Sequence, residues 1–97
     1  MSEESQWPFD QPPDCAVISV RDIVFGGTPI LYVSHDEDDQ AWQFLTGEET
    51  RKEDAVVVGL KEIVQLDTSV LKLADLPLGW IATRQSANAN WERRPRT

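Results

Sequence analysis

Three short runs of β-branched and apolar residues, each closed by turn-forming or charged residues, set the architecture of this chain. The runs are "CAVISV" (15–20), "ILYVSH" (30–35) and "AVVVGL" (55–60). Runs of this length are typical of strands in a covered sheet. A fourth segment, "AWQFLTG" (41–47), places Trp42 and Phe44 at alternate positions, as in a strand with one side facing the core. We therefore predict a strand in each of the four segments.

The stretch from residue 60 to residue 79 predicts helices. Its apolar residues recur at the i, i+3 and i+4 spacing of a helix face, first at Leu60, Ile63 and Val64 and again at Val70, Leu71 and Ala74. Asp67, followed by Thr68 and Ser69, supplies N-cap chemistry between the two sets. We therefore expect two short helices, the second ending before Pro77 and Gly79.

The C-terminal segment "WIATRQSANANWERR" predicts a hairpin. Trp80, Ala82 and Arg84 alternate with their neighbours, "SANAN" is rich in turn formers, and Trp91 can begin a return strand. The order of strands, then helices, then strands indicates an α+β domain. We expect one small domain over residues 15–94, with a mainly antiparallel sheet of about five strands and two short helices between the strand groups.

The ends of the chain are expected to differ from this domain. Residues 1–14 are acidic and proline-rich, which predicts a flexible N-terminal arm, and residues 95–97 form a short tail. The arm also holds Trp7 and Phe9, and we expect these two aromatic residues to pack back on the domain.

Charge limits the partners that the chain can attract. Residues 1–83 carry 16 Asp and Glu against 5 Lys and Arg, a balance of -11, whereas residues 84–97 carry four Arg against one Glu, a balance of +3. A negative field repels nucleic acid and anionic lipid and speeds the encounter with a basic partner. With no signal sequence and no apolar run that reaches a membrane span, we expect a cytoplasmic protein with neither a membrane nor a nucleic-acid partner.

The four consecutive acids Asp36, Glu37, Asp38 and Asp39 raise the question of a metal site. Read from Asp36, the calcium loop of an EF-hand fails where the chain has Gln40, Ala41 and Gly47. We therefore predict no metal and no cofactor, and we keep a metal-responsive domain as an alternative. Solubility alone also accounts for acids in a turn.

Catalysis has few candidate groups. His35 is the single histidine and Cys15 the single cysteine, so a nucleophile and base would have to come from these residues and Asp36. No flanking motif supports such a pair, and a catalytic site needs several groups in defined roles. We predict that the protein is not an enzyme, with a small enzyme using His35 as an alternative.

Four tryptophans in 97 residues favour a protein-binding function, because Trp often anchors interfaces. We assign Trp42 and Trp80 to the core, since both lie in alternating segments. Trp7 and Trp91, near the chain ends, are assigned as contacts. The predicted partner-binding residues are therefore the acids of the 36–39 block with Trp7 or Trp91 at its edge, and Glu48 from the next polar segment.

At "HDEDDQAWQFLTGEE", followed by "AVVVGLKEIVQLDTSVLKLADLPLGWIATR" and Trp91, the sequence resembles a bacterial family catalogued as a domain of unknown function. Part of that family is assigned to the immunity proteins of polymorphic toxin systems. The resemblance covers residues 15–93 and rests on the acidic turn before Trp42 and Phe44, the Gly47–Glu48 pair, and Asp67 with Ser69. Thr68 departs from the proline that the family favours.

The resemblance implies a small cytosolic protein without catalytic activity that binds and blocks a cognate toxin. Acidic immunity proteins meet basic toxin surfaces, and opposite charge steers such an encounter. Members without an assigned toxin leave a second hypothesis open, an accessory or regulatory binding domain of the bacterial cytosol.

Overall fold

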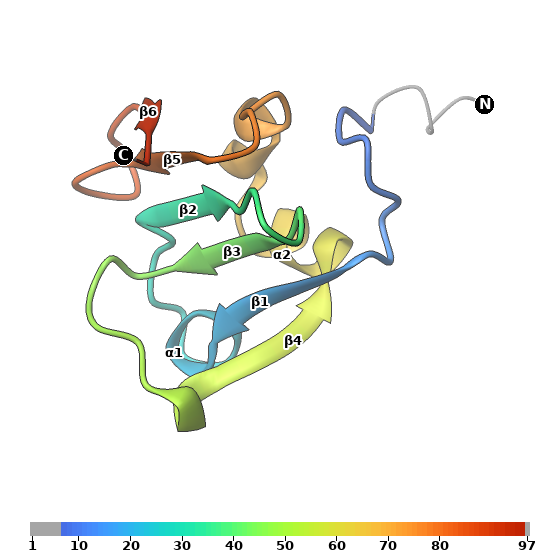
Figure 1. Cartoon of the computed structure of the whole chain (residues 1–97). Coiled ribbons are helices and arrows are strands. Elements are labelled where there is room, and N and C mark those ends of the chain that lie inside the picture. The colour runs from blue at the N-terminus through green and yellow to red at the C-terminus, as the bar shows by residue number, and fades with distance from the viewer. Residues whose placement is uncertain (1–6, 97) are drawn as a thin grey trace.

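The computed structural model describes residues 7–96 of the 97-residue chain. It is a six-stranded mixed sheet with short helices, so the α+β class is confirmed (Figure 1). In chain order the elements are β1 (Ala16–Val20), α1 (Arg21–Val24), β2 (Tyr32–His35), β3 (Trp42–Leu45), the 3-10 helix η2 (Lys52–Asp54), β4 (Ala55–Gly59), α2 (Leu60–Leu66), the 3-10 helix η3 (Thr68–Leu73), β5 (Trp80–Thr83) and β6 (Glu92–Pro95).

The strands lie in the order β4-β1-β3-β2-β5-β6. All neighbouring pairs are antiparallel except β1 and β3, which run parallel with Ile18 opposite Gln43. The expectation of a mainly antiparallel sheet holds, but the sheet has six strands instead of about five and includes one parallel pair. The parallel pair arises because β2 and β3 form a hairpin that inserts β3 directly beside β1.

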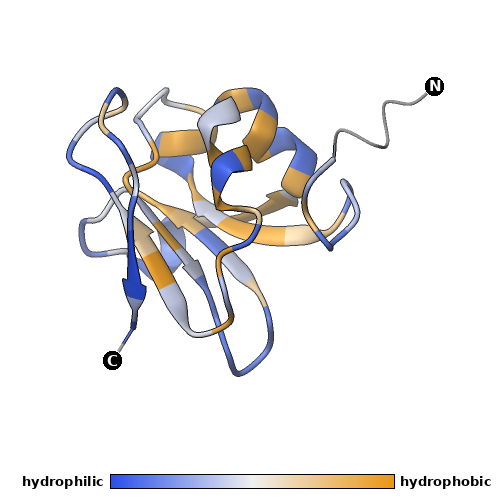
Figure 2. Cartoon of the chain, turned by 90° about the horizontal axis from the view of Figure 1, so that it is seen from above, coloured by the Kyte–Doolittle hydropathy of each residue, from blue (hydrophilic) through white to orange (hydrophobic). Residues whose placement is uncertain are grey.

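One face of the sheet is covered by α2 and η3, and the core lies between this face and the two helices (Figure 2). Trp42 and Phe44 are 1% and 0% exposed, so their assignment to the core is confirmed. Trp80 is half-buried and packs against the same cluster. The helices contribute apolar residues at the predicted spacing, namely Leu60, Ile63, Val70 and Leu73.

Asp67 separates the two helices as its sequence context predicts. Its carboxylate accepts hydrogen bonds from the backbone N–H of Ser69 at 2.9 Å and from the Ser69 hydroxyl at 2.7 Å. These bonds cap the first turn of η3 and satisfy a donor that would otherwise lack a partner. The second helix is a 3-10 helix, which accommodates its short length.

The chain ends add to this framework on both sides. β5 and β6 form the predicted C-terminal hairpin, with Ile81 opposite Arg94. In the segment assigned to the N-terminal arm, Phe9 is 5% exposed and packs edge-on against Trp42, with ring centroids 5.3 Å apart. Residues 1–6 of the arm and Thr97 of the tail lie outside the described residues. Within residues 7–96, no helix has both the length and the apolar character needed to cross a membrane.

Candidate binding surface

The acidic block forms the tight connection between β2 and β3. The backbone N–H of Asp36 donates to the Ala41 carbonyl at 2.8 Å, which closes the turn. The Asp39 carboxylate accepts from the Ala41 N–H at 3.0 Å, an Asx-type bond that stabilises the turn locally. Gln40 adopts φ 61°, in the left-handed region where the chain reverses. One of the four acids therefore has a role in forming the turn itself.

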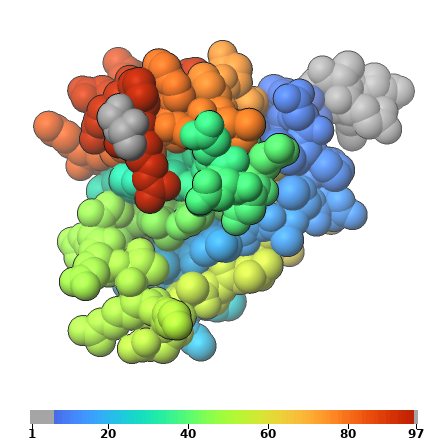
Figure 3. All heavy atoms as spheres, viewed as in Figure 1, coloured from blue at the N-terminus to red at the C-terminus, as the bar shows by residue number. Residues whose placement is uncertain are grey.

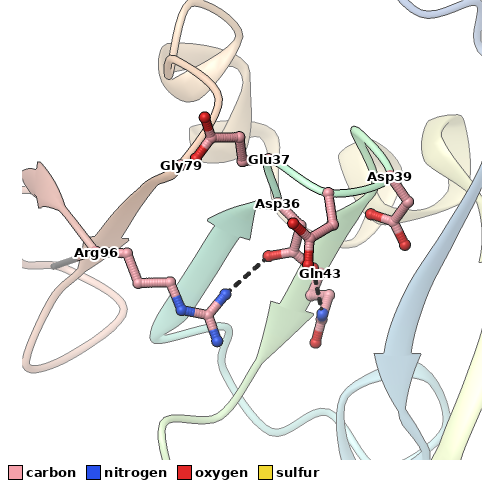
Figure 4. Close-up of a pocket in the computed structure, with 7 residues that line it drawn as sticks. Asp36, Glu37, Asp39, Gln43, Gly79 and Arg96 are labelled. Atoms are coloured by element: carbon pink, nitrogen blue, oxygen red, sulfur yellow. Dashed lines mark hydrogen bonds and ion pairs between the residues drawn. The ribbon is translucent and has the colours of Figure 1, made fainter.

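Asp36 differs from the other three acids because its carboxylate is held on both sides (Figure 4). One oxygen accepts from the Gln43 side-chain amide at 2.6 Å, and the other accepts from the Arg96 guanidinium at 3.0 Å. The Asp36 side chain is 16% exposed, whereas that of Arg96 is 55% exposed. Asp36 is thus partly enclosed and its charge is balanced within the chain.

Glu37, Asp38 and Asp39 remain exposed. Among residues 7–96, no ion pair involves any of these three carboxylates. They surround a hollow of about 430 Å³, which is completed by four other residues: Asp36, Gln43, Gly79 and Arg96. Gly79 lies at φ 82° beside the Glu37 side chain, which brings the start of β5 against the acidic turn. We call this the acidic hollow.

Glu48 lies beside the acidic hollow on the same face of the molecule. It lines a smaller hollow of about 160 Å³ together with Tyr32, Ser34, Gln43, Leu45, Gly47 and Arg96. Gln43 and Arg96 border both hollows, so the two hollows are neighbours. In Figure 3 the acidic turn stands at the front of this face, with the C-terminal segment next to it. The structure therefore brings five predicted site residues together: Asp36, Glu37, Asp38, Asp39 and Glu48.

Trp7 and Trp91, the two aromatic residues predicted at the edge of this site, line neither hollow. Trp7 is half-buried against Phe9, and its indole N–H donates to the Gln11 carbonyl at 2.7 Å. The guanidinium of Arg84 lies over the ring of Trp91, with its central carbon 4.1 Å from the ring centroid. Both rings have packing roles within the domain, away from the acidic hollow.

Among residues 7–96, Arg84 is the most enclosed charged residue, with 1% of its side chain exposed. Its guanidinium forms an ion pair with Asp67 and donates to the Ser69 hydroxyl and to the Ile30 and Ala87 carbonyls. Burial raises the pKa of Asp67, but the hydrogen bonds from Ser69 and Arg84 outweigh burial and hold that pKa below its ordinary value. This cluster ties β5 to η3 and to the loop before β6.

The three groups of the catalytic alternative are held in separate surroundings. The His35 ring stacks on Trp42 with centroids 4.0 Å apart, and its Nδ1–H donates to the Leu76 carbonyl at 2.7 Å. Asp36 faces Gln43 on the opposite side of the sheet, and the Cys15 thiol lies near the Ala16 carbonyl. Among residues 7–96, no group of three His, Cys, Asp or Glu side chains is arranged to hold a metal ion.

Three residues that line the acidic hollow were not among the predicted site residues: Gln43, Gly79 and Arg96. The alternation of β3 carried a signal for Gln43, because it points away from the face of Trp42 and Phe44. No local pattern pointed to Arg96, which reaches Asp36 from 60 positions along the chain.

The comparisons with known proteins returned no match, whether the chain was set against family models, curated proteins or solved structures.

Proposed function

We propose that this chain is a non-catalytic binding domain of the bacterial cytoplasm whose acidic hollow and Glu48 engage a basic protein. The observation that carries the proposal is the gathering of five carboxylates in two hollows that share Gln43 and Arg96. A formal net charge of -8 adds a long-range field of the same sign. Such a surface steers a basic partner toward it and discriminates against acidic proteins.

The acids that would contact the partner are Glu37, Asp38 and Asp39. They are exposed and lack ion pairs among the described residues, so a partner's Lys or Arg can approach them without first breaking a salt bridge. Asp36 already has Arg96, and its bonds to Gln43 and Arg96 position the turn on which the exposed acids stand. A rigid support of this kind lowers the ordering cost of binding.

Among basic partners, we propose a cognate toxin, with this chain as its immunity protein. The sequence resemblance to a family partly assigned to such proteins supports this choice, and so does the acidic face. Immunity requires only that the toxin be occupied, which a domain without catalytic groups can achieve.

A co-expression experiment tests this function. The gene next to this one is expressed in a bacterial host alone, with the wild-type chain, and with a Glu37→Lys/Asp38→Lys variant. We expect arrested growth in the first culture, restored growth in the second and arrested growth in the third. The matched control, Asp14→Lys/Asp22→Lys, changes two exposed acids outside the acidic hollow and should restore growth. A neighbouring product without toxicity, or equal protection by the hollow variant, would overturn the proposal.

A further inference from the structure

The two edge strands of the sheet are very different in chemistry. β6, "ERRP", presents three charged residues and a proline, which are features that discourage pairing with another strand. β4, "AVVVG", has no charged residue and no proline, and Figure 1 shows no segment beyond it among residues 7–96. Val57, at its centre, is 70% exposed. β4 is therefore the edge open to association.

The hydrogen-bond pattern of β4 identifies which backbone groups face outward. The Leu60 N–H donates to the Cys15 carbonyl, and the register places Val57 opposite Ile18. Because bonded pairs alternate along an antiparallel ladder, Val56 and Val58 are the residues that bond to β1. Ala55, Val57 and Gly59 direct their backbone groups toward the open edge.

Two of these outward groups already have partners at the strand ends. The Ala55 N–H donates to the Lys52 carbonyl in η2, and Gly59 is the N-cap of α2, where its carbonyl accepts the first helical bond. Within the part of the chain that the structure describes, the groups left for a new strand are the Ala55 carbonyl, the Gly59 N–H, and both groups of Val57. An antiparallel partner strand in the right register could form hydrogen bonds with all four of these backbone groups.

A second copy of β4 matches that set when Val57 lies opposite Val57 of the second copy. In this register each Val57 N–H donates to the other Val57 carbonyl, and each Gly59 N–H donates to the Ala55 carbonyl of the other copy. A shift by two residues in either direction leaves the Val57 N–H or its carbonyl without a partner. The backbone thus selects one symmetric register.

We propose that two copies of this chain associate through β4 as a symmetric dimer with one continuous sheet across the interface. Pairing uses both β4 edges, and the charged, proline-containing β6 edges remain outside, so association stops at two copies. The dimer uses a different part of the surface from the acidic hollow, so the proposal does not depend on the proposed function.

Sedimentation equilibrium of the full chain tests the dimer at concentrations from about 10 μM to about 1 mM, a range suited to a small interface. We expect the mass to rise from 11.0 kDa toward twice that value. Val57→Lys should abolish detectable association over this concentration range, because two like charges then meet at the axis. The control Leu66→Lys alters an exposed apolar residue of α2, 49% exposed, and should leave association unchanged.

A mixing experiment shows whether the Val57 variants lose the dimer because like charges meet at the axis or because an apolar side chain is lost. Val57→Lys and Val57→Glu chains should each be monomeric, and an equimolar mixture should form a heterodimer because opposite charges then meet. In wild-type protein, amide exchange at Val57 and Gly59 should slow as concentration rises. A wild-type chain that stays monomeric, a dimer that persists in Val57→Lys, or a mixture that stays monomeric would overturn the proposal.

Discussion

The guanidinium of Arg96 donates a hydrogen bond to the carboxylate of Asp36 at 3.0 Å, joining residues 60 positions apart in the sequence. The backbone N–H of Arg96 also donates to the Gly79 carbonyl at 2.9 Å. The C-terminal segment is therefore fixed beside the acidic turn. One acid of the block is neutralised by the chain itself, and Glu37, Asp38 and Asp39 are left as the outward charges.

Arg96→Gln should strengthen binding of a basic ligand, because it removes the one cation among residues 7–96 that lines the acidic hollow. We expect a hexa-arginine peptide to bind more tightly to this variant than to wild type at low salt, and the difference to disappear at about 0.5 M salt. The unfolding free energy should fall by less than about 1 kcal/mol, since the Arg96 side chain is 55% exposed. Titration calorimetry measures binding. Lys72→Gln, an equal charge change on η3, should have a smaller effect on affinity.

Arg84→Gln should destabilise the fold strongly, because it leaves Asp67 without its charged partner in a partly enclosed site. Loss of one member of a buried pair costs about 3–5 kcal/mol. The matched control is Arg93→Gln, whose ion pair with Asp75 is exposed and should contribute at most about 1 kcal/mol. Urea unfolding of both variants measures the difference. An equal loss of unfolding free energy in the two variants would show that the buried ion pair contributes no more to stability than the exposed one.

Asp67 should make stability depend on pH in the acid range. Its pKa in the folded state is held below the ordinary value, so the folded state binds a proton less readily than the unfolded state does. The resulting stability is present above about pH 4 and is lost as the pH falls through the folded-state pKa. Asp67→Asn should lower the unfolding free energy at pH 7 and flatten its decline at acid pH. Parallel curves for the variant and wild type would contradict this assignment.

Local sequence patterns were sufficient for most of the elements and for the core. The β-branched runs, the alternation at Trp42 and Phe44, and the cap at Asp67 each depend on neighbours within a few residues. Pairing of β1 with β3 depends on where the β2–β3 hairpin inserts, which no local pattern encodes.

Arg84 was predicted as part of the C-terminal hairpin and of a basic C-terminal segment, and not as a buried residue, yet only 1% of its side chain is exposed. Its position in the alternation with Trp80 and Ala82 placed it on the inward face, and its charge obscured that signal. Arg84, Arg93 and Arg96 form ion pairs with Asp67, Asp75 and Asp36, respectively. Which acid each one would meet was set by the tertiary fold.

Gly79→Ala and Gly47→Ala should separate backbone strain from damage to the acidic hollow. Both glycines have positive φ, 82° and 93°, so alanine should cost about 1–2 kcal/mol at each site. A Cβ at residue 79 would lie 3.3 Å from the Glu37 carboxylate, whereas one at residue 47 meets no atom within 4 Å. Only Gly79→Ala should therefore weaken hexa-arginine binding. Equal binding by the two variants would exclude a close role for Glu37.

The most direct test of the acidic face is salt-dependent capture of a partner from the native cell lysate. Wild-type chain and the Glu37→Lys/Asp38→Lys variant serve as paired baits, with washes at about 0.05 M and about 0.5 M salt. We predict a basic protein that is retained by wild type at low salt, released at high salt and absent from the variant. Retention of the same proteins by both baits, or a partner that resists high salt, would contradict it.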